Sequence, residues 1–236
     1  MIECDLHVHS IRSTCGFHTL LEIVSIMRGK GAAAFALTDH GPVLGTPRSH
    51  FSVLLRRLPA VVEGVRVFKG IEASVLSVEG TLDLPVFEGA PYEIIIAGLH
   101  PHDEFAEGRS RAEHTRALEN AVRRFPAIRG ITHPTYAAYP LDLDRITDFA
   151  AEKNVALELN NSHIRNGKTD MDETARLLEL ARAKGAPLMV NSDGHVFSEM
   201  AEYERALALL EPHGLDSFRI VNRTLESTLA FLGLES

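Results

Sequence analysis

Short apolar runs alternate with amphipathic stretches along the whole chain. The runs are rich in β-branched and other aliphatic residues and are mostly continuous, which is typical of strands buried on both faces of a parallel sheet. We expect seven such strands, at residues 2–7, 34–39, 65–73, 93–99, 129–133, 155–160 and 187–191.

The stretches between these strands have the spacing of helices. The clearest covers residues 172–184, where Leu177, Leu178 and Ala181 share one face and Gly185 supplies the stop. Further helices are expected at residues 19–30, 49–58, 110–124, 142–153, 198–210 and 225–232. No linker or low-complexity tract interrupts the alternation. The pattern therefore predicts one α/β domain over residues 1–236, a closed or nearly closed TIM-like barrel rather than a doubly wound sheet.

Composition and charge narrow the class of protein. Of 236 residues, 45% are hydrophobic and 24% charged, which excludes disordered, collagen-like and disulfide-stapled chains. The formal net charge of −8 disfavours stable binding to nucleic acid or to an anionic membrane. No apolar run approaches the ~20 residues that span a bilayer, the first residues lack a secretory signal, and only two cysteines are present. We expect a cytoplasmic protein without a membrane partner.

Histidine is frequent, with twelve residues against four tyrosines and no tryptophan. Barrel enzymes carry their chemistry at the C-terminal ends of the strands, and most of the predicted strands end at a histidine or a carboxylate. These residues are His7, His9, His40, Glu72, His100, His133, Asp193 and His195. A single histidine at a strand end is more often a hydrogen-bonded core residue than a ligand. Their joint placement favours a metal centre.

The spacing of these residues suits chelation. Along an extended chain, residues two apart share one face, so His7 pairs with His9 and Asp193 with His195. Imidazole and carboxylate ligands suit zinc, manganese or iron, and a carboxylate such as Glu72 can bridge two ions. Six histidines and two carboxylates exceed what one ion needs. The sequence predicts two to three divalent metal ions, with zinc as the first candidate and manganese or iron as alternatives.

Several motifs resemble one known family. They are DLHVHS at 5–10, LTDHGP at 37–42, GIEAS at 70–74, IIAGLHP at 95–101, ITHP at 131–134, ALELNNS at 156–162 and NSDGH at 191–195. In this order and spacing the chain is similar to the PHP (polymerase and histidinol phosphatase) domain family, in particular its single-domain YcdX-like phosphatases. The resemblance covers nearly the whole chain and implies a distorted seven-stranded (β/α)7 barrel with a trinuclear site.

The resemblance also implies a ligand set for each ion. The first ion is expected on His7, His9, Glu72 and Asp193, and the second on Glu72, His100 and His133. The third is expected on His40 and His195, where the family's usual third histidine is replaced by Cys15. A thiolate binds zinc or iron well, so Cys15 is the predicted ligand. His18 is the other candidate, and a weak or empty third site is the alternative.

Loop residues give softer candidates. Asp5 and Asp39 are expected to orient histidines, and Asn160 and Asn161 could contact the substrate or simply open a turn. Loop cations and a loop histidine could clamp a phosphate, although many such groups are merely solvated. They are Arg12, Arg48, His50 and Arg165. The remaining histidines, His102, His114, His163 and His213, are expected at the surface or the rim.

A multinuclear centre suits phosphate ester hydrolysis. Divalent ions make hydroxide available near neutral pH and neutralise phosphoryl oxygens, so we expect a small phosphate monoester as substrate and a metal-bridging hydroxide as nucleophile. Glu72, Asp193 and Arg12 are the candidate catalytic residues, with Asp193 as a proton carrier and Arg12 stabilising developing charge. The alternatives are an amidohydrolase-like hydrolase, a nuclease of the same chemistry, or a non-catalytic metal-stabilised binding domain. The oligomeric state stays open.

Overall fold

One curled sheet runs through the protein. The structure is a computed structural model that describes residues 1–44, 55–84, 92–101, 105 and 107–235. Its strands follow the order β1-β2-β4-β5-β6-β7-β8-β9, with every neighbouring pair parallel, while β3 pairs antiparallel with β4. The bounds are β1 Cys4–Val8, β2 Ala34–Leu37, β3 Val61–Val62, β4 Val65–Ser74, β5 Ile94–Gly98, β6 Ile128–Ile131, β7 Ala156–Asn160, β8 Pro187–Asn191 and β9 Arg219–Ile220.

The two ends of this sheet meet. Val8 forms a parallel bridge with Gly194, just past β8. Near the start of β1, the Glu3 amide donates to the Arg223 carbonyl (3.1 Å) and the Cys4 amide to that of Asn222 (3.3 Å). The predicted α/β fold, a distorted TIM-like barrel, is confirmed, and all seven expected strands lie within a few residues of their predicted positions.

The barrel interior is packed with apolar side chains. Leu6, Phe68, Ile96 and Met189 belong to one buried cluster, against which helix α8 also packs. Gly130 makes room for Met189, because a Cβ on this glycine would lie 2.4 Å from the Met189 methyl group. The strands therefore stay close together around a solid core. Above this core, their C-terminal ends converge.

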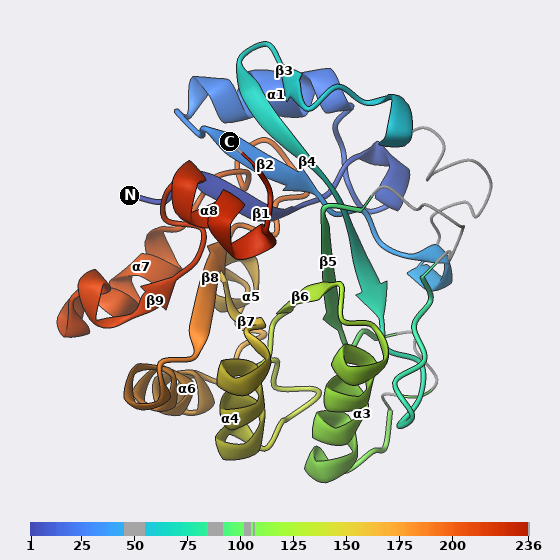
Figure 1. Ribbon diagram of the computed structural model, residues 1–236, viewed down its shortest axis with the longest axis vertical. Helices are drawn as coiled ribbons and strands as arrows, with labels where there is room; N and C mark the ends of the chain where they lie inside the picture. Colours follow the sequence, from blue (N-terminus) through green and yellow to red (C-terminus); the bar gives the residue numbers. More distant parts are fainter. Residues whose placement is uncertain (45–54, 85–91, 102–104, 106, 236) are drawn as a thin grey trace.

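Helices pack on the sheet, most of them on its outside, whereas α8 packs against the interior cluster (Figure 1). They are α1 Leu20–Gly29, α3 Arg111–Arg124, α4 Leu143–Lys153, α5 Asn161–Arg165, α6 Met171–Lys184, α7 Glu204–Leu210 and α8 Leu225–Leu232. Ser110 caps the N-terminus of α3 by accepting from the Glu113 amide, and α6 ends at Gly185 with φ 66°. None of the described helices is long and apolar enough to cross a membrane.

The helix expected at residues 198–210 is shorter than predicted. It begins only at Glu204, because the preceding segment is bound to the barrel: the Ala201 amide donates to Asp5 Oδ2 (3.2 Å), with φ 53° at Ala201. Residues 49–54 of the helix expected at 49–58 lie outside the described residues. Three short elements, β3, β9 and α5, were not expected from the sequence.

Candidate metal centre

The strand ends bring the predicted ligands together at the barrel mouth. His7 belongs to β1 and His9 follows it, Glu72 lies near the end of β4, and His100 and His133 follow β5 and β6. His40, beyond β2, and Asp193 and His195, beyond β8, complete the ring. All of them except His40 and His195 are less than one tenth exposed.

Glu72 is the centre of this cluster, with histidine nitrogens beside both carboxylate oxygens. Oε2 lies 2.9 Å from His40 Nδ1, 3.1 Å from His7 Nε2 and 3.4 Å from His9 Nε2. Oε1 lies 2.9 Å from His100 Nε2 and 3.4 Å from His133 Nε2. One carboxylate thus faces five imidazole rings, which is the geometry expected of a bridging ligand.

Asp193 supplies the second carboxylate. Its Oδ1 lies 3.2 Å from His9 Nε2 and 3.5 Å from His7 Nε2, while Oδ2 accepts a hydrogen bond from Asn160 Nδ2 (3.1 Å). The His195 ring is held by the backbone of the same turn, since its Nδ1 lies 2.9 Å from the Asp193 carbonyl. Asp193 has φ 51°, so the turn after β8 aims both side chains at the mouth.

A set of hydrogen bonds fixes the rings from behind. Glu158 Oε1 lies 2.7 Å from His7 Nδ1, Ser13 Oγ lies 3.1 Å from His9 Nδ1, and Ser74 Oγ lies 3.0 Å from His100 Nδ1. In each case one ring nitrogen is engaged and the other faces Glu72. Hydrogen bonding of the second nitrogen is the usual way in which proteins orient histidine ligands of metals.

The donor atoms fit divalent ions. His7 Nε2, His9 Nε2 and His40 Nδ1 are buried, yet none makes a hydrogen bond of acceptable geometry with the residues that the structure describes. Buried polar atoms without partners are costly. The ligand atoms form three groups, and within each group they lie within 4.8 Å of one another. The groups are His7, His9 and Glu72; His40, Glu72 and His100; and His9, Cys15, His40 and His195. Metal ions bound among these atoms would satisfy the nitrogens.

The carboxylates and the imidazole rings of the cluster shift one another's pKa values. Burial disfavours the charged form of the Glu72 carboxyl, but His7, His100 and His40 outweigh it and hold its pKa well below the usual range. Burial lowers the pKa of His100 to about 4 and, together with His195 and His40, lowers that of His9 far below its usual value. Burial disfavours the charged form of His7, His40 and His195 as well, but Glu72 raises the pKa of His7 well above its usual value and that of His40 to about 10, and Asp193 raises that of His195 to about 9. A metal ion bound by these three rings would displace their protons.

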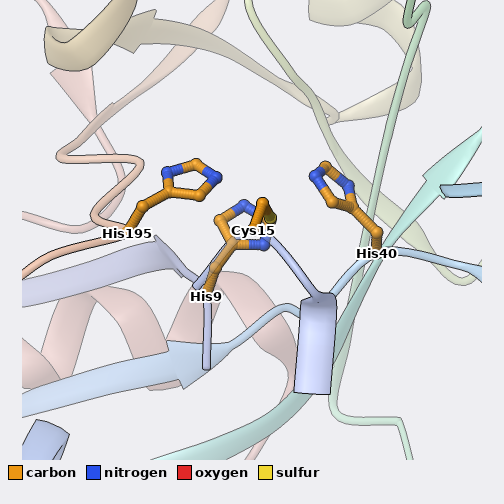
Figure 2. A group of neighbouring side chains, drawn as sticks. All are labelled: His9, Cys15, His40 and His195. Atoms are coloured by element: carbon orange, nitrogen blue, oxygen red, sulfur yellow. The ribbon is translucent and has the colours of Figure 1, made fainter. Parts of the chain in front are cut away.

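Cys15 joins the cluster from the loop after the 3₁₀ turn Ile11–Ser13. Figure 2 shows the rings of His40 and His195 on either side of it, with His9 close by. Burial raises the pKa of the Cys15 thiol, but hydrogen bonds with His195 and His40 outweigh burial and lower it to about 7. His18, the other candidate, is engaged elsewhere, because its Nε2 accepts from the Phe197 amide (3.0 Å).

A cavity of about 320 Å³ opens over the cluster. This volume suits a small ligand. Several predicted ligands form its floor, and the loops after β1, β2, β5, β6 and α5 form its walls. The lining residues are Ser13, Thr14, Cys15, His40, Leu44, Glu72, His100, Pro101, His133, Tyr136, His163, Lys168, Asp193 and His195.

The three predicted substrate contacts that the structure describes do not line this cavity. Arg12 lines a separate cavity of mainly apolar character, Asn161 Oδ1 accepts from the Ala206 amide (3.0 Å), and Arg165 pairs with Glu199. Arg48 and His50 lie outside the described residues. A substrate role for these residues stays a prediction without geometric support.

The predicted orienting residues do bind backbone or side-chain groups near the ligands. Asp39 accepts from the amide and the hydroxyl of Ser10 (both 2.7 Å), which fixes the loop between His9 and Cys15. Asp5 accepts from the Ser192 amide (3.1 Å), directly before Asp193. Both carboxylates therefore stabilise ligand-bearing loops.

Several residues of the site were not predicted from the sequence. Glu158 is buried beneath the cluster, Lys168 lines the cavity, and His163 stacks on His133 with ring centroids 4.6 Å apart. His163 was expected at the surface or rim but is buried, as is His114. Glu158 could have been found from the alternation of side chains along β7, because it lies two residues before Asn160 and therefore on the same face of the strand.

Comparison with known proteins gives the family. No family model matches the sequence. A curated "probable phosphatase" of Shewanella frigidimarina is 35% identical over 232 residues, which is 97% of this chain and 92% of the relative. Another, from Aeromonas hydrophila, is 34% identical over 230 residues with the same two shares. The chain belongs to this phosphatase family. The phosphatase is thus a hydrolase, as the sequence predicted.

Solved structures share the fold of this phosphatase. A histidinol phosphate phosphatase from Lactococcus lactis, complexed with zinc, L-histidinol and phosphate, superposes with a TM-score of 0.66 at 19% identity, covering 92% of this chain and 95% of that chain. An amidohydrolase 2 from Bifidobacterium longum superposes with a TM-score of 0.56 at 12% identity, covering all of both chains. At these identities the likeness concerns the barrel fold.

Proposed function

We propose that the protein is a metal-dependent phosphatase of the PHP type that hydrolyses a small phosphate monoester at a centre of two to three divalent ions. The observation that carries this proposal is Glu72, whose two oxygens face five histidine nitrogens at 2.9–3.4 Å. The phosphatase relatives indicate the reaction class. The zinc and phosphate bound to the Lactococcus neighbour support a divalent metal as cofactor and phosphate as a product.

The ligands would divide into three sets. His7, His9, Glu72 and Asp193 would hold the first ion, and Glu72, His100 and His133 the second. His40, His195 and Cys15 would hold the third. When bound, such ions supply Lewis acidity toward the phosphoryl oxygens and lower the pKa of water, which makes it a better nucleophile toward phosphorus near neutral pH.

The residues around the centre would orient the reactants. Glu158, Ser13 and Ser74 hold three imidazole rings in fixed orientations. Asp193, fixed by Asn160, is the candidate carrier of the proton that passes from the attacking water to the departing alcohol. In the overall reaction an oxygen–phosphorus bond forms with water, and the ester oxygen–phosphorus bond breaks.

The outer wall of the cavity would hold the rest of the substrate. Lys168 is its only lysine or arginine among the described lining residues. The loop that carries Lys168 is fastened to the β6 loop by two backbone hydrogen bonds, from the Ala137 amide to the Lys168 carbonyl (3.0 Å) and from the Asp170 amide to the Thr135 carbonyl (2.9 Å). An anionic substrate group near this ammonium is favoured electrostatically.

A panel of aryl esters tests the reaction class. The metal-loaded protein should hydrolyse an aryl phosphate monoester much faster than the matching phosphate diester, and should leave the aryl acetate unreacted. Rapid hydrolysis of the acetate alone would overturn the proposal in favour of carbonyl chemistry. Rapid hydrolysis of the diester with little action on the monoester would indicate a nuclease-like enzyme instead.

A further inference from the structure

Cys15 distinguishes the third ligand set from the other two. Its sulfur and the ring nitrogens of His9, His40 and His195 lie within 4.8 Å of one another (Figure 2). The two other groups of ligand atoms, on His7, His9 and Glu72 and on His40, Glu72 and His100, offer only nitrogen and oxygen. Of the ligand sets in the described part of the chain, this one alone contains sulfur.

The backbone holds this sulfur in place. The Ile11 amide donates to the His18 carbonyl (2.8 Å) and closes the loop that carries Cys15. The Phe17 amide donates to the His195 carbonyl (2.9 Å), which fastens the loop to the turn after β8. Thr14, with φ 61°, directs the chain into this turn. The loop that carries Cys15 and the turn that carries His195 are far apart in the sequence, and this hydrogen bond links them close to the sulfur.

His9 gives a second observation, because it belongs both to the group of ligand atoms around Glu72 and to the group that contains Cys15. His9 is fully buried, and its Nε2 makes no hydrogen bond of acceptable geometry with the described residues. Its Nδ1 is engaged by Ser13 Oγ (3.1 Å), whose oxygen also accepts from the His40 amide (2.9 Å). Ser13 thus couples the two histidines and leaves His9 Nε2 directed into the cluster.

We propose that His40, His195 and Cys15 form a thiolate site that selects a thiophilic divalent ion, such as Zn²⁺, Co²⁺ or Cd²⁺, over Mn²⁺ or Mg²⁺. Soft sulfur ligands favour such ions, whereas nitrogen and oxygen ligands accept a broader range. On binding, the thiol loses its proton as the sulfur–metal bond forms. The metal centre therefore contains two classes of site. This inference rests on the proposed metal-dependent function and adds the chemistry of one ion to it.

Cobalt reports directly on the sulfur. Metal-free protein titrated with Co²⁺ should develop the near-ultraviolet charge-transfer band of a cobalt–thiolate bond, saturating at one thiolate-bound ion per chain. Added Zn²⁺ should abolish the band, whereas the same concentration of Mn²⁺ should leave it. The band should be lost in Cys15→Ser and Cys15→His, and Cys15→His should still bind the ion through its new imidazole.

Cys4→Ala is the matched control, because Cys4 is buried in the barrel interior, away from the cluster. It should keep the band. Absence of the band in wild-type protein that binds Co²⁺ and hydrolyses phosphate would overturn the thiolate site and leave the proposed function standing. A band that Mn²⁺ removes as readily as Zn²⁺ would overturn the selectivity. A band in a protein without phosphatase activity would overturn the proposed function alone.

Discussion

Glu158 acts on His7 through the ring nitrogen that does not face Glu72. Oε1 lies 2.7 Å from His7 Nδ1 and accepts from Asn191 Nδ2, while Oε2 accepts from the His133 amide and from Asn160 Nδ2. This carboxylate therefore links the ends of β1, β6, β7 and β8. It is a positioning residue, since its contacts are with ligands and their neighbours.

Replacing Glu158 by glutamine should weaken metal binding. The backbone and amide groups around the carboxylate are donors, so either orientation of the new amide places its NH₂ against one of them. We expect metal affinity to fall about 10–100-fold, measured by titration of metal-free protein. Glu119→Gln is the control, because Glu119 is equally buried but pairs with Arg145 on the outer helices. Wild-type affinity in Glu158→Gln would contradict the positioning role.

Lys168 is the residue that should bind substrate without touching the metals. In Lys168→Met we expect KM for a phosphate monoester to rise about tenfold, the loss typical of one charge-assisted contact, with kcat nearly unchanged. Steady-state kinetics measure both constants. Lys184→Met is the control, since Lys184 pairs with Asp148 away from the cavity. An unchanged KM would remove Lys168 from the substrate site.

Among individual residues, the sequence predicted those whose position depends on the end of a strand. The histidines, Glu72 and Asp193 end or follow continuous apolar runs, and parallel strands bring such positions together. Lys168 and His163 could not be placed, because they depend on α5, a single helical turn that leaves no periodic signal. Of the predicted phosphate clamps, Arg165 pairs with Glu199, because a loop cation on the correct face can still find a partner elsewhere.

Among the elements, β5 and β6 are the pair whose packing bears most directly on the site. A Cβ on Gly98 would lie 2.1 Å from Thr132 Oγ1 and 3.0 Å from His133 Cε1. The glycine thus lets the end of β5 approach the residues that follow β6. It sets the distance between His100 and His133, whose Nε2 atoms are 3.3 Å apart.

Gly98→Ala should lower the free energy of unfolding by about 1–3 kcal/mol, as overpacking usually does. Chemical denaturation of metal-free protein isolates this packing effect from metal loss. Gly29→Ala is the control, because a Cβ at the end of α1 meets nothing within 4 Å; it should be neutral or slightly stabilising. Equal stability of both variants would show that the β5–β6 contact tolerates a methyl group.

The start of a helix could be predicted where a capping residue in the sequence sets it. Ser110, Asp142 and Asp170 cap α3, α4 and α6 where the sequence predicts a start, give or take two residues. The start of α7 could not be predicted, because it is set by a contact between Ala201 and Asp5, residues 196 positions apart. Two-residue strands such as β3 and β9 carry too few positions for a periodic signal.

For the whole molecule, the metal centre should stabilise the fold as well as act in catalysis. With ions at about a thousand times their dissociation constant, the loaded protein gains about 4 kcal/mol. In a chain of this length, this corresponds to a rise in Tm of about 8–16 °C. Calorimetry before and after a chelator should reveal the difference. Glu72→Gln should show a much smaller shift, and a wild-type Tm unaffected by chelation would contradict a structural contribution.

The barrel as a whole could be predicted because strand and helix alternate without interruption. A closed or nearly closed barrel was predicted, but not the contacts that close it, which are the bridge between Val8 and Gly194 and the backbone bonds to the segment after β9. These contacts have no signature in the local pattern of apolar residues. They also bring the loops of Cys15 and His195 together, so the third ligand set depends on tertiary closure.

The most direct test of the account is to measure metal content and aryl phosphate hydrolysis on the same samples of wild type, Glu72→Gln and Glu93→Gln. Glu93 pairs with Arg66 away from the cluster, so its variant should match wild type. Wild type should hold two to three ions and lose its activity on stripping, regaining it with Zn²⁺ or Mn²⁺. Glu72→Gln should lose at least two ions and nearly all activity. Full activity in metal-free wild type, or in Glu72→Gln, would contradict the account.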